Sequence, residues 1–159
     1  MSLPTIRELR RSLSQPGSHV ALIDRMLARA QEPAAAHVFT TLLADSARAA
    51  ALEADARLAA GQSLAPLAGL PVTVKDLYDI AGRTTMAGSV LRQGLPPADQ
   101  DAAAVARLRR AGAALLGLTN MSEFAFSGIG INPHHGTPRN PCDAEVARIP
   151  GGSSSGSPP

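Results

Sequence analysis

The sequence predicts an α/β fold in which N-terminal helices precede a βαβ unit. Two observations favour this class. Up to about residue 60 the apolar residues recur at helical spacing, with much alanine among them. Beyond residue 63, two short apolar runs at about 70–75 and 113–118 are separated by another stretch of helical spacing. Strand, helix and strand joined by short turns form a βαβ unit, so we expect the two strands to be parallel and to lie adjacent or one strand apart.

Three helices are expected before residue 62. The first covers about 4–13. The second is capped by Ser18, because serine at this position can accept hydrogen bonds from the first turn. The third runs from about 34 to 60 and stops at Gly61.

We interpret residues 1–62 as a helical brace that demands no chemistry of its own. His19 and His37 lie in it without partners at the spacing of metal ligands, and we interpret both as ordinary polar positions.

The second half supplies the predicted βαβ unit. Val72 and Val74 are β-branched, as is typical of a strand. Asp99 or Asp101 is expected to cap the following helix, which ends near Ala111. Residues 63–159 therefore comprise the βαβ unit and the loops around its site, and residues 1–159 form one portion of a single domain.

Lys75 closes the first predicted strand and is the chain's only lysine, among fourteen arginines. Arginine does not lose its proton in a protein, whereas a desolvated lysine can, so lysine is the cation that can act as a base. The residues alone leave two interpretations open: a catalytic amine, or one lysine left by chance in an arginine-rich composition.

Chemistry in parallel sheets gathers outside the carboxyl ends of the strands. This rule places Lys75 near the segment that follows the second strand. Asn120, Met121 and Ser122 are therefore the candidates for a substrate pocket.

The final segment is rich in glycine and serine, and two interpretations again stay open. Such ends are commonly flexible linkers. Alternatively, a tight loop, which includes Gly151, Gly152, Ser154 and Ser155, presents serine hydroxyls and backbone amides to a substrate.

The composition argues against several classes of protein. The net charge is +2, and the basic residues are interspersed with acids and not with aromatics, so nucleic-acid binding is unsupported. The lone Cys142 excludes an internal disulfide, and no apolar run reaches the length of a membrane span. We expect a cytoplasmic protein with no membrane partner.

The adjacent His134 and His135 lack the spacing of a metal site, and we expect no metal.

Four motifs together resemble the amidase signature family, in the family's order, from about residue 42 to 157. They are Gly69-Leu-Pro-Val-Thr-Val-Lys-Asp, Gly117-Leu-Thr-Asn-Met-Ser-Glu-Phe-Ala-Phe, Asn132-Pro-His-His-Gly-Thr-Pro-Arg-Asn-Pro and Pro150-Gly-Gly-Ser-Ser-Ser-Gly-Ser. The resemblance implies a mixed-sheet fold that this chain supplies only in part. It also implies cleavage of a carboxamide through a Ser–cis-Ser–Lys triad and a serine acyl-enzyme, without a cofactor.

Carried over by position, the resemblance makes Lys75 the base and Ser153 the bridging serine, with a cis Gly152–Ser153 bond. The family's attacking serine lies in a later glycine-rich segment, which these 159 residues do not contain. We therefore expect an amidohydrolase fragment that acts on a small-molecule amide only when that segment is supplied. Two alternatives stay open: an amidotransferase A-type subunit that supplies ammonia from glutamine, and a non-catalytic truncated remnant. Assembly into a homo-oligomer is a further open expectation.

Overall fold

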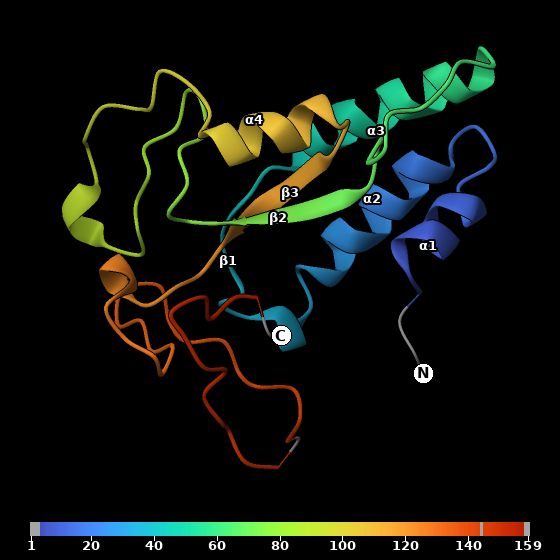
Figure 1. Cartoon of the computed structure of the whole chain (residues 1–159). Coiled ribbons are helices and arrows are strands. Elements are labelled where there is room, and N and C mark those ends of the chain that lie inside the picture. The colour runs from blue at the N-terminus through green and yellow to red at the C-terminus, as the bar shows by residue number, and fades with distance from the viewer. Residues whose placement is uncertain (1–3, 144, 158–159) are drawn as a thin grey trace.

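The computed structural model describes residues 4–143 and 145–157. Helices lie on both faces of a small sheet (Figure 1). In chain order the elements are α1 (Ile6–Ser12), α2 (Ser18–Arg29), η1 (Pro33–Ala35), β1 (Phe39–Leu42), α3 (Ala44–Ala59), β2 (Pro71–Lys75), η2 (Val90–Arg92), α4 (Ala103–Arg110), β3 (Ala114–Thr119) and η3 (Glu123–Ala125). No described helix has the length and apolarity that crossing a bilayer requires.

The sheet has three strands in the order β1-β3-β2. β2 and β3 run parallel, and their carboxyl ends are in register, with Lys75 opposite Thr119. This confirms the expected parallel direction, and of the two expected arrangements the adjacent one is found. β1 pairs with the other edge of β3 in the antiparallel direction, so the sheet is mixed.

β3 is the centre of the core, because every one of its residues is buried. Residues Ala114 and Leu116 face α2 and α3, and pack against Ile23, Leu27 and two alanines. Leu115 and Leu118 belong to a second cluster on the side of α4, whose inward residue is Val105. The helix between the two parallel strands therefore packs on one face of the sheet.

The predicted helix over 34–60 is wrong in its first ten residues. The chain forms the short turn η1, then β1, and only then α3. Val38 and Leu43 are buried, and Phe39 and Thr41 pair with β3. The sheet edge offered by β3 outweighs the weak helical tendency of Phe, Thr and Thr in this segment.

Two predicted helix caps are also wrong. Gly17, with a positive φ of 88°, is the N-cap of α2, and Ser18 is already helical. Neither Asp99 nor Asp101 caps α4, whose N-cap is Ala102. Asp101 instead accepts a hydrogen bond from the backbone amide of Ala81 and forms an ion pair with Arg109 at 2.8 Å.

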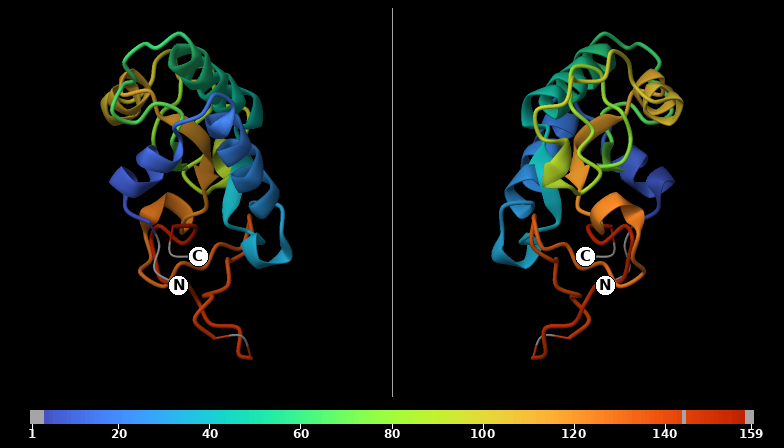
Figure 2. Two further views of the ribbon diagram at one scale, coloured as in Figure 1. Left: turned by 90° about the vertical axis from the view of Figure 1, so that its right-hand side faces the viewer. Right: turned by 90° about the vertical axis from the view of Figure 1, so that its left-hand side faces the viewer.

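The residues after β3 form an irregular region beside the carboxyl ends of β2 and β3. In Figure 1 this orange-to-red segment lies below the sheet, and in both views of Figure 2 it lies at the end of the molecule opposite α3. The glycine- and proline-rich composition of residues 128–141 predicts such a loop region, since these residues punctuate regular structure.

Candidate active site

Lys75 is the last residue of β2, and its side chain is half-buried at the carboxyl edge of the sheet. Its Nζ donates a hydrogen bond of 2.7 Å to Oγ of Ser153, across 78 residues of sequence. The sequence predicts this contact. Of the two interpretations of the glycine- and serine-rich segment, the ordered loop is the one that the structure adopts through Ser157.

Burial lowers the pKa of the Lys75 amine below its ordinary value, because desolvation disfavours the charged form. The described residues place no carboxylate within hydrogen-bonding distance of Nζ that would restore it. The amine is therefore easier to deprotonate than an exposed lysine, and a neutral amine at this distance can accept the proton of a hydroxyl.

The backbone on each side of Ser153 is fixed by neighbouring loops. The Gly152–Ser153 peptide bond is cis. The amide of Gly152 donates to the carbonyl of Gly128 at 2.9 Å, and the amide of Ser122 donates to the carbonyl of Ser153 at 2.9 Å. A Cβ on Gly152 would lie only 2.6 Å from the amide nitrogen of Gly130, so this position requires glycine.

The other expected loop residues are also ordered. Gly151 has a φ of 87°, a conformation that favours glycine. The carbonyl of Ser154 accepts a hydrogen bond from the amide of Ser157. Ser155 is fully buried, and its hydroxyl has no hydrogen-bond partner among the described residues.

Asn120, Met121 and Ser122 are all fully buried. Asn120 Nδ2 donates to the carbonyls of His37 and Gly136, both at 2.9 Å, and its Oδ1 accepts from the amide of Met121. The Ser122 hydroxyl donates to the carbonyl of Ser127. Their polar groups therefore join the loops around Ser153. All three residues occupy buried, structural positions.

Asn132 has a comparable role that the sequence did not reveal. Its Nδ2 donates to the carbonyls of Gly88 and Met121, and its Oδ1 accepts from the amides of His134 and His135. Four hydrogen bonds from one buried amide tie three loops together. The available signal was weak: Asn132 precedes Pro133, a pair that is typical of turns.

Asp76, next to the lysine, was missed as well. Its side chain is 1% exposed. Burial raises the pKa of this carboxyl, although the amides of Gly88 and Met86, the hydroxyl of Thr40 and the nearby His135 oppose the rise. One oxygen, Oδ2, has no hydrogen-bond partner among the described residues. Asp76 therefore anchors the 86–88 loop directly behind Lys75.

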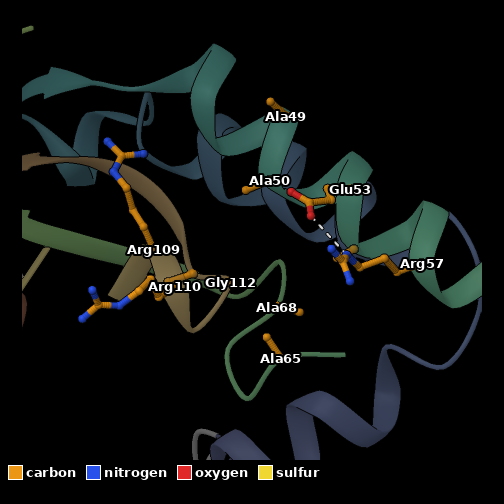
Figure 3. Close-up of a pocket in the computed structure, with 11 residues that line it drawn as sticks. Ala49, Ala50, Glu53, Arg57, Ala65, Ala68, Arg109, Arg110 and Gly112 are labelled. Carbon is orange, nitrogen blue, oxygen red and sulfur yellow. Dashed lines mark hydrogen bonds and ion pairs between the residues drawn. The ribbon is translucent and has the colours of Figure 1, made fainter. Parts of the chain in front are cut away.

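Residues 4–143 and 145–157 bring together no group of three His, Cys, Asp or Glu side chains that could hold a metal ion. A cavity of about 500 Å³ lies elsewhere, between α3 and the segment that follows α4, and neither Lys75 nor Ser153 lines it (Figure 3). Alanine residues make up much of the lining of the cavity, and its Glu53 forms an ion pair with Arg57. We assign it no part in the chemistry of Lys75.

The model of the family described as Amidase matches residues 21–158. This chain belongs to the amidase family. The resemblance found in the four sequence motifs is thereby confirmed, and so is the mixed α/β class, because solved amidases superpose on most of the chain.

Two relatives of the chain differ in sequence identity and in how much of the chain they match. AtzE, the 1-carboxybiuret hydrolase subunit of Pseudomonas sp. (strain ADP), is 52% identical over 121 residues, which are 76% of this chain and 26% of that protein. The A-type subunit of the glutamyl-tRNA(Gln) amidotransferase from Azoarcus sp. (strain BH72) is 44% identical over 156 residues, covering 96% of this chain and 31% of the relative. The chain thus spans between a quarter and a third of these relatives.

Solved structures also match the fold of this chain. A vestigial protein complex described as revealing the origins of an s-triazine catabolic enzyme matches with a TM-score of 0.81 at 46% identity, covering 87% of this chain and 30% of that one. The native peptide amidase of Stenotrophomonas maltophilia matches with a TM-score of 0.78 at 32% identity. The match covers 98% of this chain and 33% of the peptide amidase.

Proposed function

We propose that this chain supplies the base and the bridging hydroxyl of an amidohydrolase that cleaves a small carboxamide through a serine acyl-enzyme. The observation that carries the proposal is the 2.7 Å contact between Lys75 Nζ and Ser153 Oγ. Membership of the amidase family supports it.

In the proposed mechanism, neutral Lys75 accepts the proton of the Ser153 hydroxyl. Ser153 Oγ in turn takes the proton of an attacking serine, whose oxygen forms a bond to the carbonyl carbon of the amide. When the tetrahedral intermediate collapses, the same relay returns the proton to the departing nitrogen, and the C–N bond breaks. Water then hydrolyses the acyl-enzyme with Lys75 again as base.

The attacking serine and the oxyanion-hole amides belong, by the family resemblance, to a segment outside these 159 residues. Lys75 and Ser153 can relay a proton but do not themselves attack the carbonyl. We therefore expect residues 1–159 alone to hydrolyse no amide, since oxyanion stabilisation is usually the largest single catalytic contribution.

The test compares variants in the protein that carries this chain together with its attacking serine, using a chromogenic anilide. Ser153→Ala and Lys75→Arg should each lower kcat by about 10²–10⁴-fold, the usual contribution of general acid–base catalysis. Lys75→Arg keeps the charge and removes the base. Arg107→Lys, on the exposed face of α4, is the control and should keep full activity. Full activity in Lys75→Arg would remove the lysine from its proposed role.

A second candidate is the A-type subunit of an amidotransferase that releases ammonia from glutamine. It is favoured by the relatives of that name, because two of them align over 96% and 99% of this chain. Measuring ammonia release from glutamine beside anilide hydrolysis separates the two. Co-purification of a second subunit together with glutamine specificity would favour the amidotransferase.

A further inference from the structure

A second cavity, of about 490 Å³, lies between α1 and the 64–68 loop, beyond the amino end of β2. Its lining includes three arginines from α1, Arg7, Arg10 and Arg11, and the buried His19 of α2. Among the residues that the structure describes, the rest of the lining is aliphatic, from Ile6 and the 64–68 loop, and no acidic residue contributes to it. The volume lies within the range of small-ligand pockets.

The three arginines share one face of α1 because they stand at i, i+3 and i+4. Like charges at this spacing repel each other, and no described carboxylate forms an ion pair with any of them. Glu8, the acid within the same helix, is engaged with Thr5 in a capping box. The face therefore carries an uncompensated positive charge.

His19 distinguishes this site from an ordinary solvated helix face. Its side chain is 3% exposed, and Nδ1 lies 2.8 Å from Oδ1 of Asp55 on α3. Asp55 also accepts hydrogen bonds from the amides of His19 and Val20, and so anchors the amino end of α2. With Nδ1 engaged, the ring orientation is fixed, and Nε2 has no hydrogen-bond partner among the described residues.

The walls of the cavity are preformed. On one side, Leu9 and Leu13 attach α1 to the cluster of Leu22 and Leu70. On the other side, the amide of Leu67 donates to the carbonyl of Ala111, and the amide of Gly69 donates to the carbonyl of Gly112. The imidazole also packs on Gly69, where a Cβ would lie 2.7 Å from its Cδ2.

We propose that this cavity binds the oxyanion group of a small molecule, a phosphate or a carboxylate, through Arg7, Arg10, Arg11 and Nε2 of His19. Guanidinium groups match both anions in bidentate geometry. Asp55 holds the imidazole in place through Nδ1, so Nε2 is the ring nitrogen left for the anion. The site is separate from Lys75 and independent of the proposed hydrolysis.

The test is calorimetric titration of the purified protein at fixed ionic strength with inorganic phosphate, pyrophosphate and citrate in separate arms. We expect saturable one-to-one binding in at least one arm. The arms distinguish the source of the anion: phosphate compounds alone, carboxylates alone, or both. Binding in no arm overturns the proposal.

The decisive variant is Arg7→Gln/Arg11→Gln, and it should weaken binding at least tenfold. Its control, Arg25→Gln/Arg107→Gln, removes the same charge from exposed positions outside the cavity and should bind like the unmodified protein. Equal weakening in both variants would show attraction by net charge alone and overturn the site.

Imidazole NMR of the unmodified protein supplies a readout that needs no variant. The chain has four histidines, and only His19 lines this cavity. Adding the bound anion should shift the Nε2 resonance of His19 and leave those of His37, His134 and His135 in place. Shifts confined to the other three would contradict the proposal.

Discussion

The backbone amide of Ser122 donates a hydrogen bond of 2.9 Å to the carbonyl oxygen of Ser153. Ser122 lies three residues beyond the end of β3, and β3 is paired with the strand that ends at Lys75. The central strand therefore positions both members of the Lys75–Ser153 pair, one by its ladder with β2 and the other through the segment that follows it. The amide of Gly156, which donates to the carbonyl of Asn120, adds a second such link.

The titration of Lys75 can be measured directly, because the chain has no other lysine. Dimethylation with ¹³C-formaldehyde labels this amine, and its carbon shift then reports protonation. The pKa should lie below the ordinary value of 10.5 in the folded protein, because burial disfavours the cation.

The same label in guanidinium-unfolded protein is the reference. Since the unfolded chain then binds the proton more tightly, the free energy of unfolding should rise with pH between the lowered value and 10.5. A folded pKa at or above the unfolded one would contradict the assignment of Lys75 as a base.

Asp76→Asn should change how stability depends on pH. The folded pKa of Asp76 is raised, so the stability contributed by its protonated form is fully present below 3.8 and is lost as pH rises through the folded pKa. The asparagine variant does not ionise and lacks this loss. Urea unfolding from pH 4 to 7 should show the variant gaining stability relative to the unmodified protein as pH rises.

Asp99→Asn is the matched control for Asp76, because Asp99 is exposed. The same gain in stability with pH in this variant would show that the effect does not depend on burial of the carboxyl. A pH-independent difference for Asp76→Asn would show that the buried carboxyl titrates normally.

Gly117→Ala should destabilise the protein by about 1–3 kcal/mol, the usual cost of overpacking. Gly117 lies in β3, where a Cβ would stand 2.6 Å from the carbonyl oxygen of Thr41 and 2.8 Å from the ring of Phe39. Gly128→Ala is the control: a Cβ there meets nothing within 4 Å, and the effect should stay within about 0.5 kcal/mol. Equal midpoints in urea for the two variants would argue against the close approach of β1 to β3.

Asp55→Ala should lower the free energy of unfolding by about 3–5 kcal/mol. The substitution leaves the buried His19 without its partner and two amides of α2 without their hydrogen-bond acceptor. The exposed pair of Asp24 and Arg48, at 2.7 Å, is the comparison. Asp24→Ala should cost less than about 1 kcal/mol. Chemical denaturation of the two variants side by side measures the difference, and similar losses would mean that the Asp55 pair is not effectively buried.

The elements that could be predicted from sequence are those with a local signal. β2, α4 and β3 are each marked by an apolar pattern and bounded by glycine, so their order and parallel pairing followed from spacing. β1 could not be predicted in this way. Its partner β3 lies more than 70 residues later, and nothing in Phe39-Thr-Thr-Leu42 alone shows that a sheet edge will be there.

For the candidate site, the sole lysine at a strand end could be found from the residues, whereas its partner Ser153 came from the family resemblance. The supporting amides were not predictable. Asn120 and Asn132 donate to backbone carbonyls of distant loops, and a carbonyl carries no sequence signal. The His19–Asp55 pair was missed for another reason: the two residues are 36 positions apart, and each looks like a surface residue.

β2, which ends at Lys75, is an edge strand in the described structure, with β3 on one side only. The outer row of backbone N–H and C=O groups of an edge strand can accept another strand. A segment that paired with this edge would run alongside the strand that ends at Lys75. Because burial lowers the pKa of Lys75, a strand that buried the amine further would lower this pKa further.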